Sequence, residues 1–523
     1  MACEELQLRL DPRTAYTPML LSAEVSRILD IDANRIKEVH ITRRSIDARQ
    51  RRVMVNLTVK AFVDCMPQPG ELASPVEYAK LPADAPECVV VGAGPAGLFA
   101  ALRLIELGIR PTVLERGKDV DSRRKDMAMI AREGVVNEDS NYCFGEGGAG
   151  AFSDGKLYTR SKKRGSIDKI LNIFHQHGAQ ESILCDAHPH IGTDRLPEVI
   201  KNIRHTIERC GGQILFNQRV TDIALTDGTA TGVTTATGDR FEGPVILATG
   251  HSARDVYGML QRQGIDMEAK GIAVGVRLEH PQKLIDAIRY HNPGGRGKYL
   301  PPAEYTMLTR VDGRAVYSFC MCPGGVIIPA ASAPGQMVVN GMSSSSRGGA
   351  RANSGMVVEV LPEDLPSQYT MFGPLKMMKF QEDIETAFFN EADRSQNAPA
   401  QRMVDFVRSR PSKDLPDTSY APGIHPARID KLLPAGIASR LQKGFEDFGR
   451  KNKGFLTNEA VLIGDETRTS APVRVLRQPD NLQHVSVGGL FPCGEGAGYA
   501  GGIVSAAIDG ERCADAVASY LGL

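Results

Sequence analysis

The sequence of 523 residues predicts an α/β protein in which both ends of the chain build one domain. A mixed α+β domain is inserted into that domain, and a small α+β module precedes it. Three observations predict this: a strand, glycine-rich turn and helix begin at residue 87, a second glycine-rich turn and helix occupy residues 490–509, and strand-like runs fill much of the chain between them. The predicted boundaries are 1–80 for the module, 87–264 and 480–523 for the shared domain, and 265–479 for the inserted domain.

The N-terminal module carries its own helix and strand patterns. Residues 24–29 have a helical pattern, whereas residues 36–41 and 53–63 are typical of strands. Arginines crowd into residues 43–52, and such a run either binds phosphates or a partner, or forms a solvated turn with intramolecular ion pairs. We favour the second interpretation, because no aromatic residues are interleaved for stacking on bases. The proline-containing stretch 66–86 is the expected linker.

The stretch 87–117 combines the parts of a dinucleotide-binding Rossmann-type unit. Residues 88–91 form an apolar run suited to a buried parallel strand, and a G-x-G-x-x-G turn follows it. In this motif the glycines permit the sharp turn, the approach of a pyrophosphate and tight packing of the helix. The second strand ends at an acid about 20 residues further on, where a carboxylate accepts hydrogen bonds from a ribose. The expected contacts with an adenosine diphosphate group are Gly92, Gly94, Pro95, Ala96, Gly97, Glu115 and Arg116.

A second glycine cluster, FGEGGAGAFSDG at residues 144–155, contains too much glycine for a stable helix or strand. It suits a loop that lies against a flat cofactor and its phosphates. The expected contacts in and beside this loop are Gly148, Ser153, Asp154 and Lys156.

The chain then predicts a regular succession of elements up to residue 250. A helix at 196–210, a strand at 214–216, alternating segments from Val220 to residue 240 and a strand at 244–248 lead to Thr249 and Gly250. We expect Val220, Thr249 and Gly250 at the cofactor. Beyond them, the inserted domain shows β-like runs and then a helix-rich stretch. The β-like runs are 271–278, 315–319 and 337–342, and the helical segments cover much of 375–410 and 427–451.

The last motif runs from a strand end into a glycine turn and an apolar helix. Its expected cofactor contacts are Gly494, Glu495, Gly501, Gly502 and Ile503. It resembles the second FAD fingerprint of glutathione-reductase-type flavoproteins, in which an acid holds the ribityl or pyrophosphate part of FAD. Here that acid is Glu495 in place of aspartate. The helix beginning near Gly502 would place amides beside the flavin edge where negative charge collects on reduction.

Five segments extend the likeness over nearly the whole chain: VVVGAGPAGLFAA, FGEGGAGAFSDGKLYTR, SFCMCPGGVIIPA, DETRTSAPVRV and FPCGEGAGYAGGI. Together they resemble the bacterial FAD-dependent dehydrogenase family of unassigned substrate. The resemblance implies FAD bound to the Rossmann-type domain and an inserted domain that presents a substrate.

Candidate reactive groups lie in the inserted domain. Cys320 and Cys322 in CMCPGG stand beside glycines that leave room for a ligand, although one intervening residue is an awkward span for a disulfide. They are either redox or substrate-contacting thiols, or small buried hydrophobic residues; no metal site is predicted. Arg468 either holds an anionic substrate or the flavin carbonyls, or forms a structural ion pair. We predict that Cys320, Cys322 and Arg468 line a cavity next to the flavin. His251, Arg277 and His280 are expected near the domain junction.

The sequence therefore predicts an FAD-dependent oxidoreductase that transfers hydride through the flavin to or from an unknown small molecule. A separate NAD(P) domain is missing, so NAD(P)H could act only as a transient electron donor. The alternatives are a reductase of isoprenoid-like substrates, a flavin monooxygenase, a flavin-binding redox sensor and an RNA-associated flavoprotein. With 62 basic and 62 acidic residues, nothing global favours nucleic acid. We expect a cytoplasmic protein with reduced cysteines and no membrane span; the sequence leaves the oligomeric state open.

Overall fold

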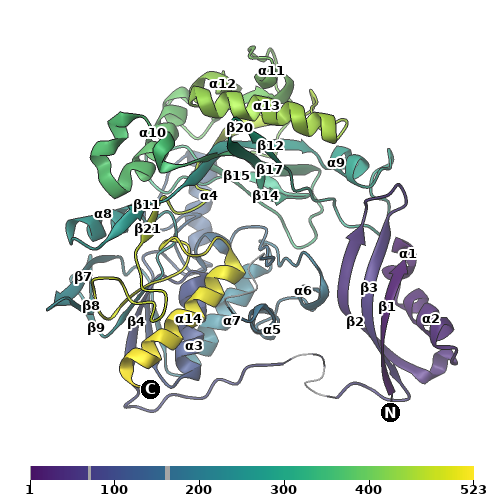
Figure 1. Ribbon diagram of the computed structural model, residues 1–523, viewed down its shortest axis with the longest axis horizontal. Coiled ribbons are helices and arrows are strands. Elements are labelled where there is room, and N and C mark those ends of the chain that lie inside the picture. The colour runs from purple at the N-terminus through teal and green to yellow at the C-terminus, as the bar shows by residue number, and fades with distance from the viewer. Residues whose placement is uncertain (1, 69–71, 73, 160–164) are drawn as a thin grey trace.

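The computed structural model describes residues 2–68, 72, 74–159 and 165–523, and it has the predicted α/β class (Figure 1). Its main sheet is parallel, with the strand order β22-β10-β4-β5-β6. These strands are β4 (Glu87–Val91), β5 (Arg110–Leu114), β6 (Gln213–Leu215), β10 (Val245–Leu247) and β22 (Leu490–Pro492). Val245 pairs with Val89 on one side and with Leu490 on the other. Both ends of the chain therefore build one Rossmann-type sheet, as predicted.

Two helices that follow the glycine motifs pack together against this sheet (Figure 1). They are α3 (Pro95–Glu106) and α14 (Ile503–Leu521). A Cβ atom at Gly510 would lie 2.1 Å from the carbonyl oxygen of Ala96, so glycine is required for this close approach. The remaining elements of this region are α4 (Arg123–Glu133), α5 (Ile167–Gln176), α6 (Ser182–Cys185), α7 (Leu196–Arg209), β7 (Val220–Thr226), β8 (Thr229–Thr235), β9 (Arg240–Glu242) and α8 (Arg254–Arg262).

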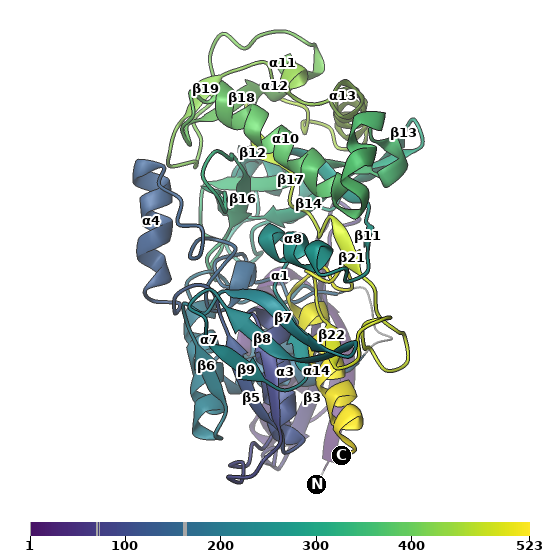
Figure 2. The same cartoon turned by 90° about the vertical axis from the view of Figure 1, so that its left-hand side faces the viewer.

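The inserted region is built on a second sheet with the order β13-β14-β17-β12-β20-β18-β19. Its strands are β12 (Ile272–Pro281), β13 (Leu308–Val311), β14 (Arg314–Cys322), β17 (Arg351–Val360), β18 (Ala398–Arg402), β19 (Ile424–Pro426) and β20 (Val461–Glu466). The associated elements are α9 (Gln282–Arg289), β15 (Val326–Pro329), β16 (Val339–Met342), α10 (Lys376–Glu391), α11 (Met403–Val407), α12 (Ile429–Leu432) and α13 (Ala435–Lys451). Figure 2 shows α10 to α13 on the side of this sheet away from the parallel sheet.

Strand β18 interrupts the stretch 375–410 that the sequence predicts as helix-rich. Its residues lie between β20 and the edge strand β19 and are mostly buried, so tertiary pairing overrides the local helical pattern. A short antiparallel ladder connects the two regions, formed by β11 (Met267–Ala269) and β21 (Val473–Val475).

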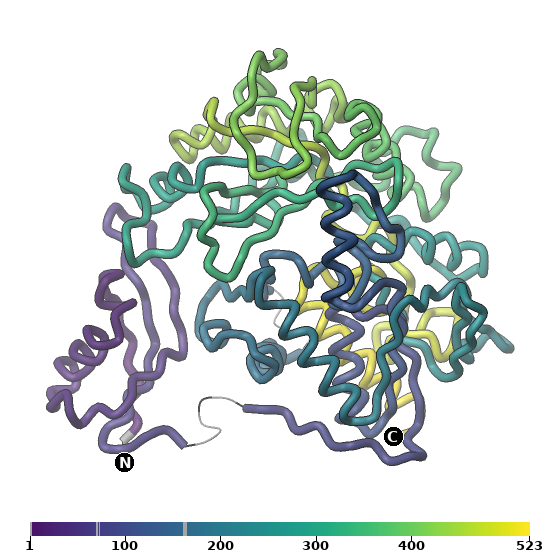
Figure 3. The backbone as a smooth tube through the Cα atoms, turned by 180° about the vertical axis from the view of Figure 1, so that it is seen from behind, coloured from purple at the N-terminus to yellow at the C-terminus, as the bar shows by residue number. Residues whose placement is uncertain are grey.

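The N-terminal module forms a three-stranded sheet that stands beside the rest of the chain (Figure 3). Its elements are β1 (Ala2–Leu10), α1 (Pro12–Ala15), α2 (Pro18–Leu29), β2 (Ile36–Asp47) and β3 (Met54–Val63). Strand β1 was not expected from the sequence. The arginine run is divided between β2 and the following turn, where Arg44 pairs with Asp186 at 2.6 Å and Arg49 with Asp47 at 2.8 Å. These contacts favour the ion-pair interpretation of the run.

None of the helices in the described part of the chain combines the length and apolarity that a membrane crossing requires.

Candidate functional site

A cavity of about 360 Å³ lies at the carboxyl ends of β4, β5 and β10. This end of a parallel sheet is where nucleotide ligands bind in open α/β folds. Among its lining residues are Gly92, Gly94, Pro95, Ala96, Glu115, Arg116, Gly148, Ser153, Asp154, Lys156, Val220, Thr249, Gly250, Glu495, Gly501, Gly502 and Ile503. The structure thus brings nearly all of the predicted cofactor contacts together. Gly97 and Gly494 do not contribute to the lining.

The first glycine turn is held by contacts between main chains. Gly92 has a φ of 103°, and a Cβ atom there would lie 2.5 Å from the carbonyl oxygen of Ala248. A Cβ at Gly97 would lie 1.8 Å from the carbonyl oxygen of Gly92, so Gly97 serves the packing of helix on strand and not the cavity. Helix α3 starts at Pro95 with Gly94 as its N-cap and no side-chain cap. Its first amides are therefore available to an anion.

Glu115 differs in part from its predicted role. Its buried carboxylate accepts hydrogen bonds of 2.9 Å from the backbone N–H groups of Ala93, Gly117 and Gly145, and it thereby joins the two glycine loops. Oε2 accepts one of these bonds and Oε1 accepts two, so Oε2 keeps a lone pair on a side chain that lines the cavity. The main role of the carboxylate is to hold the two glycine loops together, and the sequence spacing did not reveal this role.

The loop 144–155 is supported from below by Arg123, which the sequence did not single out. This fully buried side chain donates to the carbonyl oxygens of Asn141, Glu146 and Gly148 at 2.7–2.8 Å. Burial lowers the pKa of Arg123 to about 10, so it remains charged at neutral pH. A Cβ at Gly148 would lie 3.1 Å from Cα of Gly94, so the two glycine loops touch through their main chains.

Asp154 is tied to a distant arginine. Arg347 donates through Nε to Oδ1 of Asp154 at 3.0 Å and also pairs with Glu304, while Lys156 lies 3.8 Å from Asp154. Asp154 therefore holds the cavity wall in place, and Lys156 is the cation beside it. No spacing in the sequence links residues 154 and 347.

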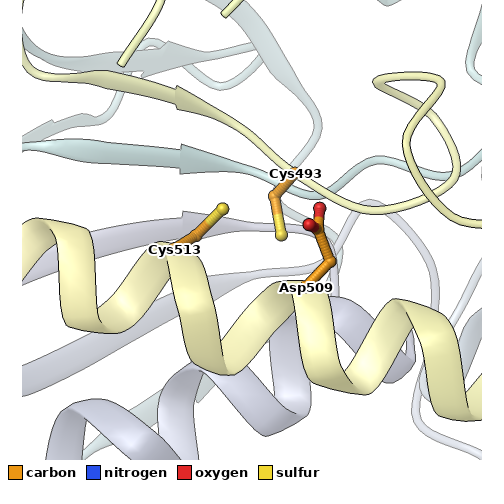
Figure 4. A group of neighbouring side chains, drawn as sticks. All are labelled: Cys493, Asp509 and Cys513. Carbon is orange, nitrogen blue, oxygen red and sulfur yellow. The ribbon is translucent and has the colours of Figure 1, made fainter. Parts of the chain in front are cut away.

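The second glycine motif is braced by a buried cluster at β22 and α14. Gly494 donates its N–H to Oδ2 of Asp509 at 2.8 Å, and Asp509 pairs with Arg477 at 2.7 Å. Figure 4 shows Cys493, Asp509 and Cys513 pointing toward one another. Because the Arg477 guanidinium also lies 3.6 Å from the Cys513 sulfur, a metal cation there would face like charge. The cluster serves to hold the turn.

Glu495 and helix α14 complete the nucleotide side of the cavity. Helix α14 begins at Ile503 without a side-chain cap. Because Gly502 and Ile503 line the cavity, the first amides of α14 face the same cavity as those of α3. Burial raises the pKa of Glu495 to about 7, although Lys270 opposes the shift. Side chains at Gly250 and Gly501 would extend into open space along this wall. Two uncapped helix N-termini and the space left by these two glycines form a cradle that fits the FAD predicted by the motifs.

The opposite wall comes from the inserted region. Phe319 and Cys320 of β14, Asn340 of β16 and Arg468 line the cavity. The prediction that Cys322 also lines it is wrong, because its side chain is fully buried behind Cys320. A β-bulge between Phe319 and Cys322 changes the alternation of side chains along β14 and produces this difference.

Arg468 is already saturated by protein contacts. Its guanidinium donates to both carboxylate oxygens of Glu385 at 3.0–3.1 Å, and to Ser252, Ser332 and Gln336. These bonds use all five of its donors. Of the two roles predicted for Arg468, the contacts favour the structural ion pair.

The two histidines and Arg277 have different positions. His251 lines the cavity, where burial and the charges of Arg468 and Arg254 lower its pKa to about 4, so it is neutral at physiological pH. His280 is buried away from the cavity against the carbonyl oxygen of Phe455. Arg277 is fully buried beneath the wall that carries Cys320.

Comparisons with known proteins agree with this geometry. Residues 195–336 match the family described as FAD dependent oxidoreductase, residues 271–469 match "FAD-dependent protein, C-terminal domain-like", and residues 2–62 match a domain of unknown function, DUF8436. A protein of Clostridium beijerinckii, described only as uncharacterized, is 40% identical over 515 residues. The match covers 95% of this chain and 95% of that protein.

Solved structures resemble the chain more remotely. A 3-ketosteroid-Δ4-(5α)-dehydrogenase from Rhodococcus jostii is 14% identical with a TM-score of 0.34, over 84% of this chain and 100% of the other. A geranylgeranyl bacteriochlorophyll reductase-like protein from Thermoplasma acidophilum is 11% identical with a TM-score of 0.34, and the match covers 83% of this chain and 78% of the other. At these scores the likenesses carry no argument about activity. On its family matches and its full-length relative, the chain belongs to the FAD-dependent oxidoreductase family, and its cofactor is FAD.

Proposed function

We propose that FAD binds along the cavity with its adenosine diphosphate half at the first glycine motif and its flavin half toward α14 and β14. The observation that carries this proposal is the shared cavity, in which both glycine motifs and the wall of the inserted region face one space. The amides at the start of α3 would bind the pyrophosphate, and Glu115 would accept from the ribose through its remaining lone pair. The amides at the start of α14 would bind the flavin.

The substrate side of the cavity is the wall formed by Phe319, Cys320 and Asn340. FAD supplies two-electron chemistry when it is bound, and the protein contributes binding, orientation and charge. Lys156 supplies positive charge to this wall. The buried hydrogen-bond network around Arg468 fixes the position of the wall. A small-molecule substrate, NAD(P)H as a visiting electron donor and a cytoplasmic location belong to the same proposal. Scattered cysteines such as Cys88, Cys210 and Cys493, which are buried as free thiols, support that location.

Anaerobic flavin reduction tests where the substrate side lies. FAD-loaded protein is mixed with NADH or NADPH, and the loss of flavin absorbance is followed. Phe319→Ala should keep FAD and change the reduction rate by about tenfold, because one wall of the donor site is lost. Tyr317→Ala on the same strand, which does not line the cavity, is the matched control. Loss of FAD in Phe319→Ala, or equal rates in both variants, would contradict this assignment.

A further inference from the structure

The substrate wall carries two thiols on one distorted turn of strand β14. Pairing with β17 is regular up to Phe319 and resumes at Cys322, so one extra residue is inserted between them. Cys320 has a φ of 44°, an uncommon conformation for a residue other than glycine. Backbone strain of this kind persists where the surrounding structure enforces it, and it concentrates at functional sites. In a regular strand, two cysteines separated by one residue are awkwardly spaced for a disulfide. The bulge changes that spacing.

The two thiols differ in exposure and lie in contact. Cys320 is half-buried and lines the cavity, whereas Cys322 is fully buried behind it. The Cys322 sulfur lies 3.4 Å from the carbonyl oxygen of Cys320, and the two thiols are close enough to shift each other's pKa. An incoming molecule would therefore meet Cys320 first, with the second thiol directly behind it.

The charges around the pair favour a thiolate at the front position. Arg277, fully buried, donates to the carbonyl oxygen of Cys320 at 2.7 Å and lies 3.4 Å from the Cys322 sulfur. The Cys322 contact, followed by the charges of Lys156 and Arg277, lowers the pKa of the Cys320 thiol, and the same contact raises that of Cys322. The acids facing the pair are Asp154, Glu466 and Glu495. Two cations this close disfavour a metal ion and favour an anionic sulfur.

We propose that Cys320 and Cys322 are a thiol–disulfide exchange pair, and that the cavity takes low-molecular-weight disulfides as its substrate class. This inference rests on the proposed function, which makes the β14 wall the substrate side.

The exchange balances in two displacements. The Cys320 thiolate attacks one sulfur of R–S–S–R, forming a Cys320–S–S–R bond and releasing RS⁻. Cys322 then loses its proton and attacks the Cys320 sulfur, forming the Cys320–Cys322 disulfide and releasing a second RS⁻. The proton that Cys320 gave up in forming its thiolate and the proton lost by Cys322 end on the two released thiolates. The substrate is reduced by two electrons, and the family's oxidoreductase activity supplies the two electrons and two protons that restore the dithiol.

The test uses FAD-loaded protein without any electron donor, so that it reports on the thiols alone. The probe is 5,5′-dithiobis(2-nitrobenzoate), whose yellow thiolate product is counted by absorbance while the protein is weighed by mass spectrometry. Native protein should release two thiolates in a rapid phase and lose two hydrogens. Cys322→Ser should release one and retain the other as a mixed disulfide. Cys320→Ser should lose the rapid phase.

Cys185→Ser is the matched control, since Cys185 is half-buried like Cys320 but does not line this cavity. This variant should keep the rapid phase, at a rate at least about tenfold above that of the remaining thiols. A rapid phase that survives in Cys320→Ser, or a mixed disulfide that persists in native protein, would overturn the proposal. Retained FAD establishes that each variant is folded. Because no donor is present, failure of the exchange leaves the flavin-reduction experiment on Phe319 unaffected.

Discussion

Glu385 is the buried carboxylate on which two arginines of the junction depend, so replacing it by glutamine should destabilise the protein strongly. The side chain has no solvent exposure and pairs with Arg254 at 2.8 Å and with Arg468 at 3.0 Å. Thr467 also donates to it at 2.8 Å. The substitution would leave the buried guanidinium of Arg468 and the partly buried one of Arg254 without a negative partner. Breaking a buried ion pair in this way costs roughly 3–5 kcal/mol of the free energy of unfolding.

The pKa of Glu385 gives a second measure of the same interaction. Burial alone would raise it, but the charges of Arg254 and Arg468 outweigh burial and lower it from 4.5 to about 2. This shift corresponds to about 3 kcal/mol, in agreement with the first figure. Because the folded pKa is below the unfolded value, the stabilisation is complete above about pH 4.5 and is lost as the pH falls toward 2.

Urea unfolding at neutral pH measures the effect, with Glu382→Gln as the control. Glu382 lies on the same helix, is partly exposed and pairs with Lys379 at 3.6 Å. Its substitution should change the free energy of unfolding by less than about 0.5 kcal/mol. If Glu385→Gln costs less than about 1 kcal/mol, or if its deficit persists unchanged at pH 2, the reasoning is refuted.

Three further predictions concern FAD and the N-terminal module. Glu115→Ala should weaken FAD binding roughly 10- to 100-fold in equilibrium dialysis, since three backbone N–H groups lose their hydrogen-bond acceptor. Unchanged affinity would contradict this. Asp509→Asn should lower FAD affinity by loosening the Gly494 turn, whereas the exposed Asp515→Asn should not; equal effects would show that the brace is irrelevant. Deleting residues 1–80 should leave FAD bound. Salt-sensitive submicromolar binding of a short RNA through the arginines of residues 43–52 would overturn their ion-pair interpretation.

The sequence predicted most reliably what depends on short-range chemistry. An apolar run followed by spaced glycines requires a strand, a tight turn and a helix, and β4 and α3 lie where that pattern placed them. The same holds for helix α14, which begins directly after Gly502. These elements position most of the candidate cofactor contacts, so the nucleotide side of the cavity could be anticipated.

Buried charges and strand irregularities could not be predicted in the same way. Arg347 and Arg468 meet partners 193 and 83 residues away, and no periodicity records such separations. The position of Cys322 depends on a single inserted residue in β14, because one extra residue reverses which side chains face the cavity. Arg123 stands in a polar stretch of the sequence, yet it is fully buried under the second glycine loop.

The most direct test is to identify the flavin released from the purified, denatured protein. The account predicts one FAD per chain, because the first glycine motif and Glu115 are arranged for an adenosine diphosphate group that FMN lacks. Chromatography against FAD and FMN standards, with absorbance to give the stoichiometry, makes the measurement. FAD at one equivalent would support the account. FMN in its place, or protein that neither carries flavin nor binds added FAD, would contradict it.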